Sequence, residues 1–269
     1  MRSAAPRDGS DQNDAVRLHT IAHGPAPVRF LLVHGLASNA RLWDGVGGAL
    51  AARGIGSVAV DLRGHGHSPK PDDGYDHDTI TGDLVPLLED RPVVVGQSWG
   101  GCLAVELAVR HPDLVPAVVC VDGGAIDLKA RFPEWERCRE ALAPPSFNGT
   151  TLEQVTAWMR QNHADWPDAG IAGTLANFEI LENGTVRPWL TRDRHLRILR
   201  ALWEYEPSQL WPKVSCPVLF LSASELQRAA VEEAQRALPG ARVEWFEGAD
   251  HDLHAQHPER VAALLAELA

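Results

Sequence analysis

The sequence has no apolar run that approaches the roughly 20 residues needed to cross a bilayer. Its start, residues 1–14, is polar and lacks the apolar core of a signal peptide, so we expect a disordered tail there rather than an export signal. Basic residues are in the minority, with 25 Lys and Arg against 36 Asp and Glu and a net charge of −11. Because nucleic acid and anionic membranes are bound by clustered Lys and Arg, we expect neither as a partner.

Cysteine is also scarce. The four cysteines, at positions 102, 120, 138 and 216, show no CxxC or zinc-type spacing. Cys102 and Cys120 lie inside apolar segments, where a free cysteine is usually a core residue. The pattern therefore favours a reduced, cytoplasmic protein without a cysteine-based metal site. Separately, we expect a monomer or a homodimer.

Apolar segments of two kinds alternate along most of the chain. Short β-branched runs predict strands, amphipathic stretches predict helices, and their alternation predicts a mostly parallel, doubly wound α/β sheet of seven or eight strands. We expect residues 15–124 and 214–269 to form this core. The predicted strands are 16–21, 29–33, 57–61, 92–95, 117–121, 217–221 and 242–246, and the main predicted helices are 43–53, 79–88, 101–110 and 258–268.

The alternation breaks between residues 125 and 213. This stretch is rich in Trp and Pro and has helical patterns with no parallel strand between them, so we expect an inserted helical cap over the carboxyl edge of the sheet. Thr150 and Glu153 have the spacing of a capping box at the start of one of its helices. Six of the nine tryptophans lie here. Most should pack the cap onto the core, while Trp135 and Trp158 are candidates for lining a substrate pocket.

Residues 96–100, with the sequence G-Q-S-W-G, follow an apolar strand pattern and precede an apolar helix pattern. A serine at the apex of such a strand–turn–helix is the nucleophile elbow, in which a strained backbone lifts the hydroxyl clear of the sheet. The N–H groups at the start of the helix then face an incoming oxyanion. The context predicts Ser98 as a nucleophile.

Four motifs occur in a fixed order along the chain: His34-Gly35, Asp61-x-Arg63-Gly64-x-Gly66-x-Ser68, Gly96-x-Ser98-x-Gly100 and Gly248-x-Asp250-His251. This order resembles the α/β-hydrolase superfamily, in its capped, single-domain, bacterial-esterase-like branch. The resemblance extends from about residue 16 to the carboxyl end, the cap excepted. It implies an α/β-hydrolase fold and a serine hydrolase.

The remaining chemistry can be assigned around Ser98. His251 follows the last predicted strand and is the candidate base that takes the serine proton. The N–H of Trp99 is one candidate oxyanion donor, and the resemblance implies the N–H of Leu36 as the other. We expect His34 to hold its loop, and we keep it with Trp43 as a possible pocket residue. Asp61, Arg63 and Ser68 are expected to fix the neighbouring loop by local hydrogen bonds.

The acid that would orient His251 departs from the family pattern. Most relatives carry an Asp after the penultimate strand, but here residues 217–221 are followed by Ser-Ala-Ser-Glu. Glu225 is one substitute, although it also suits the first turn of a helix. Asp122 ends the strand after the elbow helix, where some superfamily members draw their acid, and it is our preferred candidate. Asp250 remains a third possibility.

We therefore expect hydrolysis of a small carboxylic ester or lactone through an acyl-enzyme, with no cofactor or metal because the side chains supply nucleophile, base and oxyanion donors. An alternative with the same residues is hydrolysis of a C–C bond in ring-cleavage diketo acids. A non-catalytic ligand binder on the same fold is a third alternative. A metal site made from His251, Asp252, His254 and His257 is disfavoured, because these residues lack a coherent zinc spacing.

Overall fold

The computed structural model describes residues 16–223, 225–238 and 240–269, so the expected tail at 1–14 lies outside the described part. Seven strands form one sheet in the order β1-β3-β2-β4-β5-β8-β9. β1 is antiparallel to β3, and all other neighbours are parallel, which confirms the expected fold class. The strands are β1 Thr20–His23, β2 Val28–Val33, β3 Gly56–Val60, β4 Val93–Gln97, β5 Val118–Val121, β8 Val218–Ser222 and β9 Arg242–Trp245.

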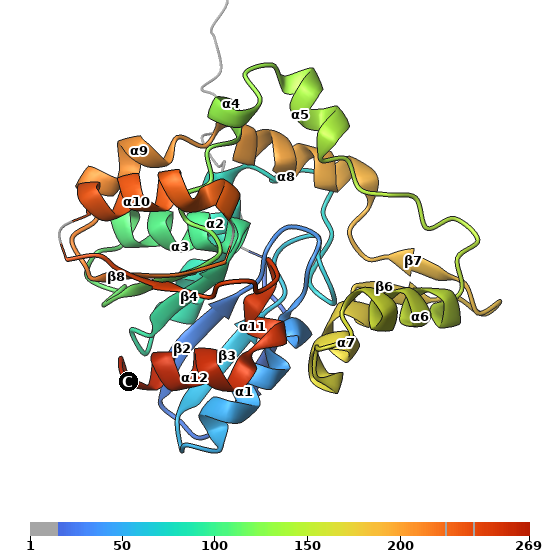
Figure 1. The fold of residues 1–269 in the computed structure, drawn as a ribbon, viewed down its shortest axis with the longest axis horizontal. Helices are drawn as coiled ribbons and strands as arrows, with labels where there is room; N and C mark the ends of the chain where they lie inside the picture. The colour runs from blue at the N-terminus through green and yellow to red at the C-terminus, as the bar shows by residue number, and fades with distance from the viewer. Residues whose placement is uncertain (1–15, 224, 239) are drawn as a thin grey trace, which may run out of the picture.

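Helices cover both faces of this sheet, because successive side chains of a buried strand point to opposite sides. Leu31 and Val33 of β2 belong to one apolar cluster, and Phe30 and Leu32 belong to another. Helices α2, α3 and α10 lie over the first face, and α1, α11 and α12 lie over the second (Figure 1). Their bounds are α1 Asp44–Ala51, α2 His77–Leu84, α3 Trp99–Arg110, α10 Arg228–Ala237, α11 Leu253–Gln256 and α12 Pro258–Ala266.

The segment between β5 and β8, here called the insertion (residues 125–213), has two parts on the carboxyl side of the sheet. Helices α4, α5 and α8 lie together above α2, while α6, α7 and the β6–β7 hairpin form a separate lobe (Figure 1). The antiparallel hairpin was not predicted from the sequence. The elements are α4 Leu128–Arg131, α5 Trp135–Ala141, α6 Leu152–Asn162, α7 Asp168–Leu175, β6 Phe178–Ile180, β7 Val186–Pro188, α8 Arg192–Glu204 and α9 Pro207–Leu210.

The capping box of α6 lies one residue later than predicted. Thr151 Oγ1 accepts the N–H of Gln154 at 3.2 Å, and Gln154 Oε1 accepts the N–H of Thr151 at 2.9 Å. The expected pair, Thr150 and Glu153, does not cap the helix. The carbonyl of Thr150 accepts the N–H of Val186, so the residue before the capping box is joined to the hairpin.

Candidate active site

Ser98 lies at the sharp turn between β4 and α3. Its backbone has φ +52° and ψ −119°, a strained conformation for a residue with a Cβ. This turn is sterically possible only because glycines flank the serine: a Cβ on Gly96 would lie 2.1 Å from the carbonyl oxygen of Gly100. The strand and helix therefore hold the serine at the carboxyl edge of the sheet, in the geometry of a nucleophile elbow.

His251 lies in the turn that follows β9, and its ring contacts Asp122 at the end of β5. The distance between His251 Nδ1 and Asp122 Oδ2 is 2.6 Å. The Asp122 side chain is fully buried, whereas half of the His251 side chain is exposed. Gln97 Nε2 also donates a 3.4 Å hydrogen bond to the carbonyl of His251, which ties this turn to the residue before Ser98.

The electrostatics of this pair favour a protonated histidine. Burial of the ring opposes protonation, but the hydrogen bond to Asp122 and the charge of nearby Asp252 outweigh it and raise the pKa of His251 above its ordinary value. Because Nδ1 faces the carboxylate, the other ring nitrogen, Nε2, is left to exchange a proton with a nucleophile. The arrangement can support general base catalysis.

The two alternative acids lie elsewhere. Glu225 is an exposed residue that pairs with Arg228 at 2.6 Å, and this partner lowers its pKa. Asp250 Oδ2 accepts hydrogen bonds from Trp166 Nε1 at 2.7 Å and contacts His163 Nδ1 at 3.1 Å. Asp250 thus joins the turn that carries His251 to the insertion, a connection that the sequence did not predict.

The two candidate oxyanion donors belong to two chain segments that lie next to Ser98. Trp99 begins α3, and its buried indole donates a 3.1 Å hydrogen bond to Nε2 of His77, which anchors the first turn of the helix. Leu36 follows β2 in a loop that closely approaches the elbow, since a Cβ on Gly35 would lie 3.0 Å from the Cβ of Ser98. The next residue, Ala37, has φ +61°.

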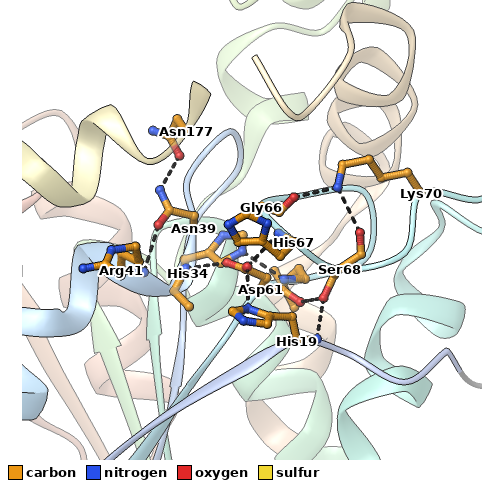
Figure 2. Close-up of polar contacts among 12 residues, drawn as sticks. His19, His34, Asn39, Arg41, Asp61, Gly66, His67, Ser68, Lys70 and Asn177 are labelled. Carbon is orange, nitrogen blue, oxygen red and sulfur yellow. Dashed lines mark hydrogen bonds and ion pairs between the residues drawn. The ribbon is translucent and has the colours of Figure 1, made fainter. Parts of the chain in front are cut away.

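The loop after β2 is held by the buried carboxylate of Asp61. Oδ1 accepts the N–H of Ala40 at 2.7 Å, and Oδ2 accepts the N–H of His67 at 2.8 Å and contacts His19 Nδ1 at 2.9 Å (Figure 2). Ser68 Oγ donates to the carbonyl of Asp61 at 2.5 Å. Together with the buried Arg63–Asp83 ion pair at 2.6 Å, these bonds fix the loops, as the motif predicts.

His34 has both ring nitrogens engaged within the fold. Nδ1 donates to the carbonyl of Gly35 at 2.7 Å, and Nε2 accepts the N–H of Leu62 at 3.0 Å. Burial lowers the pKa of His34, although the charge of Asp61 acts in the opposite direction. The side chain therefore connects the loops after β2 and β3, the role preferred from the sequence.

The three candidate pocket tryptophans occupy different environments. Trp43 is fully buried in the cluster beneath α1 and α12, where its ring lies 4.2 Å from that of His254, and this places it in the core. Trp135 packs edge-to-face on Trp203 at 6.1 Å within the insertion. Only Trp158, with 57% of its surface exposed, borders a cavity among those described below.

A cavity of about 940 Å³ opens over the carboxyl edge of the sheet and brings together Ser98, Asp122, His251 and Leu36. Side chains of α4 and α8 form its other walls, among them Arg131, His195, Leu199 and Leu202. His195 was missed in the sequence analysis, although its spacing of four and seven residues from Leu199 and Leu202 puts it on the same buried face of α8. Burial, with a contribution from Arg192, lowers its pKa to about 4.

The histidines near the carboxyl end do not assemble into a cluster. His254 is buried against Trp43, and the ring of His257 lies 6.1 Å from that of Phe246. Among the residues that the structure describes, no group of three or more His, Cys, Asp or Glu side chains is arranged to hold a metal ion. In the same part of the chain, no helix is both long and apolar enough to pass through a membrane.

Comparison with known proteins identifies the family. The family model described as the alpha/beta hydrolase family matches residues 30–264. This chain belongs to the alpha/beta hydrolase family. The match covers β2 to α12 and includes the insertion, so this hydrolase carries the family's fold over nearly its whole length.

The relatives compared here are hydrolases. The chain is 28% identical over 262 residues to 2-(acetamidomethylene)succinate hydrolase of Mesorhizobium japonicum, covering 91% of this chain and 88% of that one. A crystal structure of E-2-(acetamidomethylene)succinate hydrolase has a TM-score of 0.78 and 26% identity, covering 95% of this chain and 96% of the other. An esterase of Mycobacterium tuberculosis is 41% identical over 104 residues, which is 37% of this chain and 34% of the esterase. These similarities support hydrolase activity.

Proposed function

We propose that this hydrolase cleaves a small carboxylic ester or lactone by way of an acyl-enzyme on Ser98. The observation that carries the proposal is the 2.6 Å contact between His251 Nδ1 and Asp122 Oδ2 at the cavity that also contains Ser98. A serine hydroxyl becomes a nucleophile when an oriented imidazole accepts its proton, and a buried carboxylate on Nδ1 provides that orientation.

In the first half of the reaction, Ser98 Oγ bonds to the carbonyl carbon of the substrate, and His251 Nε2 accepts the serine proton. The N–H groups of Leu36 and Trp99 stabilise the negative oxygen of the tetrahedral intermediate. The C–O bond to the alcohol then breaks, and His251 gives its proton to the departing oxygen. In the second half, His251 takes a proton from water, the hydroxide adds to the acyl carbon, and Ser98 regains its proton as the acid leaves.

A second candidate is hydrolysis of the amide bond of a small carboxylate-bearing substrate. It is favoured by the similarity to 2-(acetamidomethylene)succinate hydrolase and by Arg131, an exposed cation on the wall of the cavity that could bind a carboxylate. The same serine chemistry would serve, with the nitrogen as the leaving atom.

A substrate panel on the purified protein tests both candidates. It contains p-nitrophenyl and alkyl esters, lactones, N-acyl enamines that carry carboxylates, and ring-cleavage diketo acids. We expect esters or lactones to have the highest kcat/KM. A preference for the carboxylate-bearing amides that falls in Arg131→Gln would favour the second candidate, and turnover of the diketo acids alone would point to C–C bond hydrolysis.

A further inference from the structure

A second cavity of about 570 Å³ lies between the insertion and the loops that follow β2 and β3, beside the cavity that contains Ser98. Most of its walls are apolar side chains of α6, β6 and the segments near them, including Phe147, Val155, Trp158, Met159, Phe178 and Trp189. Its volume falls within the range of about 300–1,000 Å³ that is usual for small-molecule sites, and its chemistry suits a hydrocarbon.

The two cavities are neighbours. His195 lines both cavities. The loop after β2 also contributes to both, because Leu36 lines the larger cavity and the next two residues, Ala37 and Ser38, line the second. The His195 ring is neutral at pH 7 because burial holds its pKa at about 4, so the shared boundary carries no charge there. A hydrocarbon chain that crosses this boundary meets no buried ion.

Two cations also border the second cavity, and both are exposed. Arg187 forms an ion pair with Glu179 of the adjacent strand, which balances its charge. Arg192 is at the amino end of α8 and lies on the surface. Neither places a buried charge in the cavity. Uncharged polar side chains such as Ser38, Asn148 and Asn177 also line it, but apolar atoms make up most of its surface, which favours an alkyl group.

The order of the strands shows on which side of Ser98 the second cavity lies. β2 and β3 lie on one side of β4, and their following loops, at Ala37, Ser38 and His65, supply the core wall of the second cavity. β5, β8 and β9 lie on the other side of β4, and they carry Asp122 and His251. The leaving alcohol takes its proton from His251, so it departs on the β5 side. The acyl group is then the part of the substrate that can extend past the oxyanion donors toward β2.

We propose that the second cavity binds the acyl chain of the ester and that the larger cavity takes the alcohol part. This assignment rests on the proposed ester hydrolysis and makes it more specific: the substrate has an apolar acyl chain of several carbons that reaches past His195. A longer acyl chain then gains affinity from burial among the side chains of α6 and the hairpin, whereas a longer alcohol gains nothing from them.

Two ester series and one matched pair of variants test the assignment. The first series is p-nitrophenyl esters with acyl chains of two to ten carbons, and the second is acetate esters with alcohols of one to eight carbons. Trp158→Ala removes one wall of the second cavity, and Ile180→Ala is the control. Trp158 and Ile180 are the exposed large apolar side chains in the described part of the chain, and only Trp158 borders this cavity.

We expect Trp158→Ala to lower kcat/KM for the octanoate and decanoate esters by about tenfold, a change of the size that small alterations in an apolar pocket produce. Its kcat/KM for the acetate ester and for the whole alcohol series should stay within about twofold of the parent, as should every value for Ile180→Ala. An equal loss in both series, or a loss confined to the alcohol series, overturns the assignment.

Binding without turnover separates this inference from the proposed reaction. Titration calorimetry measures the affinity of Ser98→Ala for straight-chain carboxylic acids of four to ten carbons. The affinity should rise with chain length and should lose most of that rise in the Ser98→Ala, Trp158→Ala double variant. If the parent hydrolyses no ester, the proposed function fails and this titration still decides the inference. A flat chain-length series, or a rise that survives Trp158→Ala, overturns it.

Discussion

The backbone N–H of Ala223 donates a 3.0 Å hydrogen bond to Oδ1 of Asp122. Ala223 follows β8, the strand after which most relatives that the sequence resembles place their own acid. Here β8 pairs with β5, so its end lies directly beside Asp122 and supplies a donor to that carboxylate instead of a second carboxylate. A buried acid that accepts a backbone N–H on one oxygen keeps the other aimed at His251.

Replacing the nucleophile is the first test of the proposed reaction. Ser98→Ala should lower kcat/KM by at least about 10³-fold, because removal of one triad member leaves only the residual catalysis of binding and oxyanion donors. The melting temperature should hardly change, since Ala has the same Cβ at this strained backbone position. A fluorophosphonate probe should label the parent at Ser98 and leave the variant unlabelled. Labelling at another residue would contradict the assignment.

The choice of acid predicts opposite outcomes for two substitutions. Asp122→Asn should fold and should lose about 10⁴-fold in kcat, as in the Ser-His-Asp enzyme where the equivalent change favours the wrong histidine tautomer. Glu225→Gln, at an exposed side chain bound to Arg228, should leave kcat unchanged. Kinetics with a good ester substrate and circular dichroism on both variants make the comparison. Full activity in Asp122→Asn would refute its proposed role.

The pH dependence follows from the raised pKa of His251. Only the neutral imidazole can accept the serine proton, so kcat/KM should fall as the pH drops through this pKa, with a midpoint above the ordinary histidine value of about 6.5. Asp252→Asn removes a charge that favours the protonated ring, and it should move this midpoint to lower pH. Asp113→Asn, at an exposed position, is the control. A midpoint that stays in place for Asp252→Asn would contradict the electrostatic account.

The effect of pH on folding stability through His251 has the opposite sign to its effect on kcat/KM. A folded-state pKa above the unfolded value means that protonation of His251 contributes stability, which is complete below the unfolded pKa and is lost as the pH rises through the folded pKa. This pair therefore contributes most to stability at acidic pH, where the proposed base is inactive.

Gly123 lies so close to the elbow that adding a single methyl group there should affect both stability and kcat. A Cβ on Gly123 would lie 2.1 Å from the carbonyl oxygen of Ser98, so Gly123→Ala must displace backbone and should destabilise the fold by about 1–3 kcal/mol while lowering kcat. Gly48→Ala is the control, since nothing lies within 4 Å of the added Cβ on the exposed face of α1. It should stabilise the protein by about 1 kcal/mol through helix propensity. Thermal melts and kcat measurements check both.

A chelator tests whether the side chains suffice for the reaction. The proposed mechanism needs only the serine, the histidine, the acid and two backbone donors, so dialysis against a chelator should leave kcat/KM unchanged. A loss of activity that a particular divalent ion restores would contradict this mechanism.

The sequence by itself determined the sheet, the elbow and the order of the motifs. These features depend on interactions between near neighbours: the β-branched runs that form the strands, the glycines around Ser98, and the apolar spacing of α3. The family match and the seven-stranded sheet confirm this part of the prediction.

Only the tertiary structure decided which distant residues meet. Asp122 and His251 are separated by 129 positions, and their contact depends on the order of β5, β8 and β9 in the sheet. The β6–β7 hairpin likewise results from pairing across the insertion, which local propensity does not encode. Burial placed Trp43 in the core and left Trp158 beside a cavity, because the sequence specifies that a side chain is apolar but not which surface packs against it.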